Sequence, residues 1–281
     1  MRLVRYGDAG REKPGLLDAQ GAIRDLSGVV KDIDGGALSP EGLAKLRGLN
    51  IDSLPKISGS PRLGPPVANV AKLIAIGLNY SDHAKESNMP IPSEPVVFMK
   101  ATSAINGPND QVLLPKGSKK GDWEVELAFV IGKTARSVSE AEALDHVAGY
   151  LICNDVSERE WQLEHGSQWS KGKSFDTFAP IGPWVVTSDE IRDPQNLAMW
   201  LDVNGQRKQT GNTNTMIFGI KKLVSYLSYF VTLLPGDIVT TGTPPGVGSG
   251  MKPTPQFLKA GDVMRVGIDG LGEQRQEVKG G

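Results

Sequence analysis

Two apolar runs of the sequence lie in DWEVELAFVIG, at residues 122–132, and in HVAGYLICND, at residues 146–155. Glu124 and Glu126 stand where the first apolar run begins, and Asp155 stands where the second run stops. Residues i and i+2 of a strand point to the same face, so Glu124 and Glu126 would aim at one point in space. Three convergent carboxylates suit a hard divalent cation such as Mg²⁺, which prefers oxygen ligands. A strand with a polar outer face would show the same alternation, and the sequence does not establish that the two strand ends meet.

The composition is typical of a globular protein that is rich in turns. The 281 residues are 39% hydrophobic and 22% charged, with a net charge of −1, so nothing suggests nucleic acid or a membrane as a partner. Cys153 is the only cysteine, which excludes an intrachain disulfide and favours a cytoplasmic location. Neither a signal-peptide core nor an apolar run of membrane-spanning length is present. The 34 glycines and 19 prolines predict short strands joined by tight turns, and therefore a mostly-β fold of the α+β class.

The chain divides into two predicted domains. Residues 1–70 form a small α+β module, with three short strands before residue 27, a helix that opens at Ser39 and Pro40, and a linker at residues 58–66. Residues 71–281 form the larger domain. Its clearest signals are strands at 70–77, 96–100, 181–186, 238–241, 263–268 and 272–278, a hairpin around Asn204 and Gly205, and a helix at 216–230.

His83 and Glu86 are the first candidates for proton transfer. A short helix capped by Ser81 or Asn79 would place both side chains on one face, where the carboxylate orients the imidazole and raises its pKa. An ordinary surface pair would give the same spacing. The other two histidines, His146 and His165, carry no comparable signal.

Lys173 lies in a Gly-Lys-Ser segment that invites a phosphate-loop interpretation. That motif also requires a glycine where Ser167 stands, and no helix plainly follows, so a phosphate loop is rejected. Residues 171–178 are instead expected to form a polar loop that leads into a strand. A second loop, at residues 240–248, could be a plain connection or the wall of a site.

Together these segments resemble the fumarylacetoacetate hydrolase superfamily. The matching pieces follow the family's order, and they are residues 77–86, 123–127, 154–157, 173–178, 180–183, 235–238 and 241–244. The resemblance covers the chain from about residue 71 to its end. It implies a mixed β-roll or sandwich with a small N-terminal domain in front of the catalytic domain, and usually a homodimer.

The resemblance also implies a role for nine residues. Its divalent cation, normally Mg²⁺ and sometimes Mn²⁺ or Ca²⁺, is held by Glu124, Glu126 and Asp155. His83 and Glu86 look like a base dyad on a lid helix, and Lys173 looks like the site lysine. Positions that contact substrate in similar members are matched by Arg159, Gln162 and Thr243.

These roles imply hydrolysis of a carbon–carbon bond in a 2,4-dioxo acid, with release of pyruvate. The carboxylate and 2-oxo group of the substrate would chelate the cation, His83 would activate water, and Lys173 would help to stabilise the enolate that leaves. The substrate would be an oxo acid of the acylpyruvate or 2,4-diketo-3-deoxy-sugar-acid type. A ureidoglycolate lyase, a 2-hydroxyhepta-2,4-diene-1,7-dioate isomerase or decarboxylase, and a metal-binding scaffold without activity all stay open, because fold does not determine function.

Overall fold

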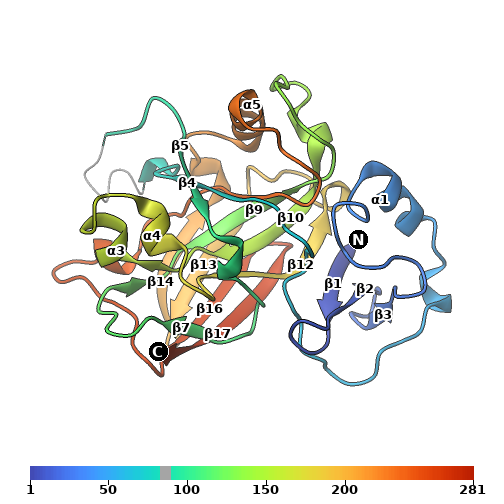
Figure 1. The fold of residues 1–281 in the computed structure, drawn as a ribbon, viewed down its shortest axis with the longest axis horizontal. Helices are drawn as coiled ribbons and strands as arrows, with labels where there is room; N and C mark the ends of the chain where they lie inside the picture. Colours follow the sequence, from blue (N-terminus) through green and yellow to red (C-terminus); the bar gives the residue numbers. More distant parts are fainter. Residues whose placement is uncertain (83–89) are drawn as a thin grey trace.

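The strands of the computed structural model, which describes residues 1–82 and 90–281, lie in three sheets (Figure 1). The ten-stranded sheet runs in the order β3 (Ile23–Asp25), β2 (Lys13–Leu17), β1 (Arg2–Tyr6), β12 (Ala179–Thr187), β10 (Val147–Asn154), β9 (Val125–Ile131), β15 (Ile238–Thr240), β4 (Leu73–Gly77) and β5 (Val96–Lys100), with β6 (Ile105–Asn106) beside β12. The five-stranded sheet runs β14 (Gln206–Asn212), β13 (Ala198–Val203), β16 (Val263–Ile268), β17 (Gly272–Gly280) and β7 (Val112–Leu114). A small third sheet pairs β11 (Ser157–Glu158) with β8 (Gly121–Asp122).

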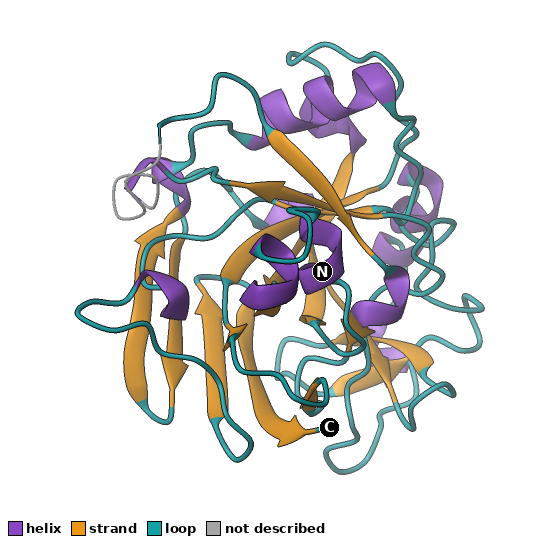
Figure 2. Cartoon of the chain, turned by 60° about the vertical axis from the view of Figure 1, so that its left-hand side comes forward, coloured by secondary structure: helices purple, strands orange, loops and turns teal. Residues whose placement is uncertain are grey.

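The described helices are short and flank the sheets (Figure 2). They are α1 (Pro40–Arg47), α3 (Arg159–Leu163), α4 (Trp169–Lys173) and α5 (Ile220–Phe230). Single 3₁₀ turns occur at Ile51–Ser53, Thr102–Ala104, Ala143–His146, Ser188–Glu190, Thr213–Thr215 and Gly248–Gly250. None of the helices in the described ranges has the length and apolar character that crossing a bilayer requires. The predicted fold class, α+β with a large excess of strand, is confirmed.

The central position of β9 and β10 explains why their sequences are apolar without alternation. Every residue of β9 and β10 is buried, because the two strands lie in the middle of the large sheet and the five-stranded sheet packs over them through β13, β16 and β17. A strand covered on both faces has no solvent side that would demand polar residues. The core of the protein therefore lies between the two sheets.

Most predicted elements are found close to their expected positions. The strands at 96–100 and 263–268, the Asn204–Gly205 hairpin and the Ser39-capped helix α1 are confirmed. Helix α5 begins at Ile220 and not at residue 216, because the backbone before it is not helical: ψ is 135° at Met216 and 168° at Gly219.

The leading strands join the large sheet. β1 pairs antiparallel with β12, with Arg2 opposite Val186 and Leu3 opposite Val185, and β2 and β3 extend the same edge. Figure 1 shows this part, in blue, on the opposite side of the molecule from α3 and α4. The division of the chain into domains at residue 70 stays a prediction.

Candidate metal centre and active-site pocket

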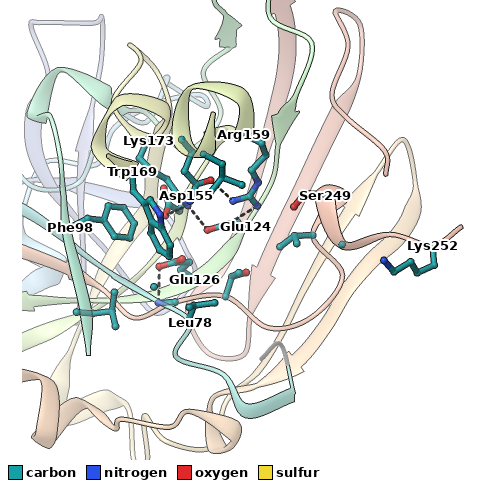
Figure 3. Close-up of a pocket in the computed structure, with 18 residues that line it drawn as sticks. Leu78, Phe98, Glu124, Glu126, Asp155, Arg159, Trp169, Lys173, Ser249 and Lys252 are labelled. Carbon is teal, nitrogen blue, oxygen red and sulfur yellow. Dashed lines mark hydrogen bonds and ion pairs between the residues drawn. The ribbon is translucent and has the colours of Figure 1, made fainter. Parts of the chain in front are cut away.

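The antiparallel pairing of β9 with β10 brings the three predicted acids together. In this register Glu126 lies opposite Cys153, and the backbone N–H of Asp155 donates to the carbonyl of Glu124 at 2.9 Å. Carboxylate oxygens of Glu124, Glu126 and Asp155 lie within 4.8 Å of one another, and all three residues are buried (Figure 3). The start of one strand therefore meets the end of the next, which the sequence had left open.

Two buried lysines form ion pairs with Asp155, each with a different oxygen of its carboxylate. Lys173 Nζ lies 2.7 Å from Asp155 Oδ2 and 2.7 Å from Glu124 Oε2, while Lys100 Nζ lies 2.5 Å from Asp155 Oδ1. Lys100, at the end of β5, was not predicted from the sequence. Its position two residues after Phe98 was the available signal, because both side chains are buried on the same face of the strand.

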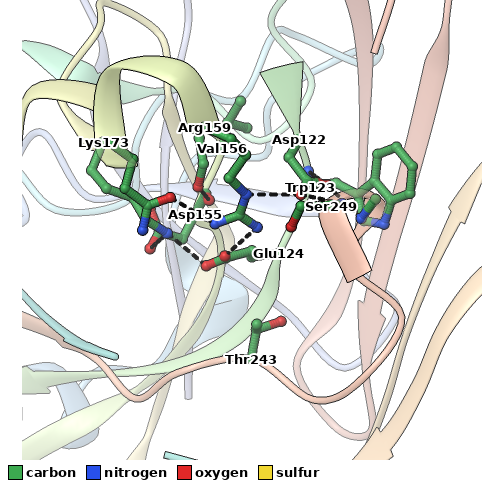
Figure 4. Close-up of polar contacts among 12 residues, drawn as sticks. Asp122, Trp123, Glu124, Asp155, Val156, Arg159, Lys173, Thr243 and Ser249 are labelled. Carbon is green, nitrogen blue, oxygen red and sulfur yellow. Dashed lines mark hydrogen bonds and ion pairs between the residues drawn. The ribbon is translucent and has the colours of Figure 1, made fainter. Parts of the chain in front are cut away.

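The guanidinium of Arg159 lies on the other side of the carboxylate cluster. Arg159 Nη2 lies 2.7 Å from Glu124 Oε1, and Arg159 Nε donates to Asp122 Oδ2 at 2.8 Å (Figure 4). Arg159 Nη1 also donates to Gln162 Oε1 at 2.9 Å, one turn along α3. The two residues that were expected to contact substrate are thus part of the network that holds Glu124, and both also line the pocket.

The predicted polar loop around Lys173 is wrong at its start, because residues 169–173 form helix α4. Close packing explains the helix. A Cβ on Gly172 would lie 2.4 Å from the backbone nitrogen of Gln162 and 2.4 Å from the carbonyl oxygen of Glu158, so only glycine lets α4 approach α3 so closely. This contact directs the next residue, Lys173, into the carboxylates, and its side chain is 2% exposed. The Gly-Lys-Ser segment therefore serves helix packing and ion pairing.

Glu124 and Glu126 differ in how well nearby cations balance their charge. Burial alone would raise the pKa of Glu124, but Lys173 and Arg159 outweigh it and lower that pKa to about 2. Glu126 has the opposite balance, since burial and repulsion from Asp155 and Glu124 raise its pKa well above the ordinary value. The backbone N–H of Gly242 donates to Glu126 Oε2 at 2.9 Å. The cluster is short of positive charge at Glu126, which is where a further cation would fit.

The acids open onto a pocket of about 440 Å³. Phe98 and Trp169 form one wall, with their ring centroids 5.5 Å apart, and Trp169 packs on Gly77, where a Cβ would lie 2.3 Å from the indole (Figure 3). Thr243 also lines the pocket, and its hydroxyl donates to the carbonyl of Val125 at 2.9 Å while it accepts from Gln209 at 2.8 Å. This volume suits a small organic acid.

The structure describes two of the three histidines. His83, together with Glu86, lies outside the described residues, so the predicted dyad stays a prediction. His146 is buried at the end of a 3₁₀ turn, with its Nδ1 3.1 Å from the carbonyl oxygen of Lys133. His165 is 43% exposed and stacks on Trp161. Neither His146 nor His165 lines the pocket, in agreement with the ordinary roles expected of them.

Comparison with known proteins places the chain. Residues 72–279 match the family described as fumarylacetoacetate (FAA) hydrolase C-terminal. The chain belongs to the fumarylacetoacetate hydrolase family. A curated relative from Burkholderia ambifaria is 62% identical over 279 residues, which are 99% of each chain, and its provisional name goes no further than hydrolase.

The solved structures that resemble the chain include both a hydrolase and an isomerase. A maleylpyruvate hydrolase from Sphingobium sp. SYK-6, in complex with manganese(II) and pyruvate, is 32% identical with a TM-score of 0.84 and covers 100% of both chains. A 2-hydroxyhepta-2,4-diene-1,7-dioate isomerase from Mycobacterium marinum is 31% identical with a TM-score of 0.78, and the alignment covers 100% of this chain and 98% of that one. Proteins that share this fold therefore include both a hydrolase and an isomerase.

Proposed function

We propose that the protein is a Mg²⁺-dependent hydrolase that cleaves the C3–C4 bond of a 2,4-dioxo acid and releases pyruvate. The observation that carries the proposal is the buried group of Glu124, Glu126 and Asp155, with Lys173 between two of them, at the base of a pocket of about 440 Å³. The structural relative that acts on maleylpyruvate, solved with manganese(II) and pyruvate, supports the same chemistry. We also propose that the protein works as a homodimer.

The net charge of the site suits a metal ion first and, once the metal is bound, an anionic substrate. Among the described residues, four carboxylates (Asp122, Glu124, Glu126 and Asp155) face three cations (Lys100, Arg159 and Lys173). The sum is −1 when all are ionised, and a divalent cation would change it to +1. An oxo-acid carboxylate then enters a site of opposite charge, whereas the cluster without metal would repel it.

A reaction follows from the groups in the pocket. When bound, Mg²⁺ would polarise the 2-oxo group of the substrate as a Lewis acid. We assign to His83, oriented by Glu86, the removal of a proton from the water that attacks C4. As the C3–C4 bond breaks, its electron pair passes into the enolate of pyruvate, whose oxygen the Lys173 ammonium stabilises. Protonation at C3 completes pyruvate, and the other product is a carboxylic acid.

The test is turnover of a simple acylpyruvate by the Mg²⁺-loaded protein, followed as loss of the enol absorbance. Hydrolysis with formation of pyruvate is the expected result. Turnover of ureidoglycolate, or isomerisation of a 2-hydroxy-2,4-dienedioate, without turnover of any 2,4-dioxo acid would overturn the choice of reaction. Mg²⁺ binding without any turnover would favour a scaffold.

Metal binding should release a proton. The pKa of Glu126 is raised in the metal-free site, so part of the population carries a proton that a metal ion must displace. Because only the carboxylate form is a ligand, the affinity for Mg²⁺ should rise with pH until the pKa of Glu126 is passed. Calorimetric titration in two buffers of different ionisation enthalpy measures the released proton. Equal binding heats in both buffers at every pH would contradict this prediction.

His83→Ala should keep the metal and lose hydrolysis. Removal of a general base costs about 10²- to 10⁴-fold in rate, whereas the Mg²⁺ affinity should change little because the carboxylates are untouched. His165→Ala is the matched control, because that exposed side chain does not line the pocket. Hydrolysis at the wild-type rate in His83→Ala would remove the dyad from the mechanism.

A further inference from the structure

Within the described residues, one cation of the pocket wall forms no ion pair or hydrogen bond with the protein. Arg159 and Lys173 are ion-paired with Asp122, Glu124 and Asp155. Lys252 also lines the pocket, yet within residues 1–82 and 90–281 its ammonium forms neither an ion pair nor a hydrogen bond. No acidic side chain other than the three candidate metal ligands lines this pocket in the same ranges. Lys252 is therefore a positive charge that remains available to a ligand.

The backbone that carries Lys252 is anchored to the site. The carboxylate of Asp122 accepts the backbone N–H of Gly248 at 2.7 Å and that of Ser249 at 2.9 Å. The N–H of Gln256 donates to the carbonyl of Gly248 at 2.9 Å, which closes the loop on the far side of Lys252. Because Asp122 also holds Arg159, the loop is tied to the same network as the acids. The backbone on either side of Lys252 is thus held to the network that contains the carboxylates.

The pocket is chemically asymmetric. Lys252 and Ser249 stand opposite Phe98 and Trp169, with the carboxylates between the two sides (Figure 3). The aromatic wall has no means of neutralising a charge, whereas the Lys252 side offers an ammonium at the exposed end of the cavity. A ligand whose 2-oxo-acid end lies at the carboxylates would direct its remaining chain toward one side or the other, and only one side suits an anion.

We propose that Lys252 is a specificity-determining residue that binds a second carboxylate at the far end of the substrate. The preferred substrate is then a dicarboxylic 2,4-dioxo acid, and chains that end in a methyl or hydroxyl group bind less well. This inference rests on the proposed function for the reaction, but the charge preference can be measured by binding alone.

Binding is tested with a pair of acids that cannot be cleaved because they lack the 4-oxo group. We compare 2-oxohexanedioate with 2-oxohexanoate, which has the same chain length and one carboxylate fewer, by calorimetry on the Mg²⁺-loaded protein. The wild type should bind the diacid about fivefold more tightly, as expected for an exposed ion pair, and added salt should reduce the preference. Lys252→Met should bring the two affinities within about twofold, and Lys252→Arg should keep the preference.

The matched control is Lys259→Met, which removes an exposed lysine of the same segment that lines a different cavity. This variant should keep the wild-type preference, and it separates a local contact from the general charge of the protein. An unchanged preference in Lys252→Met, or no preference in the wild type, would overturn the proposal. Failure of the wild type to bind either acid would overturn it as well.

Turnover separates this inference from the proposed function. The matched substrates are 2,4-dioxoheptanedioate and 2,4-dioxoheptanoate, compared by kcat/KM. Hydrolysis of both at equal efficiency would keep the function and remove the role of Lys252. Hydrolysis of neither, with a diacid binding preference that depends on Lys252, would keep the role of Lys252 and remove the proposed reaction.

Discussion

Glu126→Gln is expected to abolish Mg²⁺ binding and to lower acylpyruvate turnover by about a thousandfold or more, which corresponds to the several kcal/mol that a Lewis-acid metal contributes. Glutamine has nearly the same size, so the buried site keeps its shape, but its amide lacks the negative charge of the carboxylates through which proteins usually bind Mg²⁺. Calorimetry measures the lost binding, and the enol-absorbance assay measures the lost turnover.

Stability distinguishes this result from misfolding. The raised pKa of Glu126 means that its ionised form destabilises the folded state at every pH above the ordinary value of 4.5. Removing that charge should leave the metal-free variant at least as stable as the wild type at neutral pH, while the rise in Tm that Mg²⁺ produces disappears. Glu273→Gln, at an exposed pair with Arg265, is the control that should retain the Mg²⁺ response. Unchanged Mg²⁺ affinity in Glu126→Gln would exclude Glu126 as a ligand.

Lys173→Met should have the second large effect, and it should act on both stability and chemistry. Without the ammonium, the buried Glu124 and Asp155 lose a shared partner, and breaking such an interaction costs about 3–5 kcal/mol. Mg²⁺ should recover much of this loss, because a divalent cation neutralises the same two carboxylates. With metal bound, turnover should still be about 10²- to 10³-fold lower, since the group that stabilises the enolate is missing.

Denaturant unfolding with and without Mg²⁺ separates the two effects, and kcat at saturating substrate reports the chemistry. Lys171→Met is the matched control in the same helix, because Lys171 is exposed and donates to the carbonyl of His165. A fully active Lys173→Met protein with Mg²⁺ bound would remove Lys173 from the reaction.

Local periodicity suggested two of the three acids, although the same alternation also fits a strand with a polar outer face. Glu124 and Glu126 share a face by the geometry of any strand, and both precede an apolar run. That Asp155 joins them depends on the pairing of β9 with β10, a contact between distant parts of the chain. The ordered match of several segments to a known family supplied that information, and local pattern did not.

Lys100 and helix α4 show where such reasoning stops. Lys100 follows an apolar strand like any solvated lysine, and only the structure reveals that Asp155 accepts it in the interior. The segment around Gly172 favours a loop by composition, yet its packing on α3 makes it helical. In both cases tertiary contacts decide, and a short window of sequence does not contain them.

Asp122 has a consequence for how the specificity of this protein can change over evolution. Its carboxylate holds Arg159 of the reacting centre and the amides of residues 248 and 249. Substitutions at Asp122 would therefore disturb catalysis and substrate selection together, and purifying selection should keep it fixed. Residues 251–254 lie just beyond this anchor, are largely exposed and make none of its hydrogen bonds. New substrate ranges can therefore arise by drift in that short segment while the reaction itself is preserved.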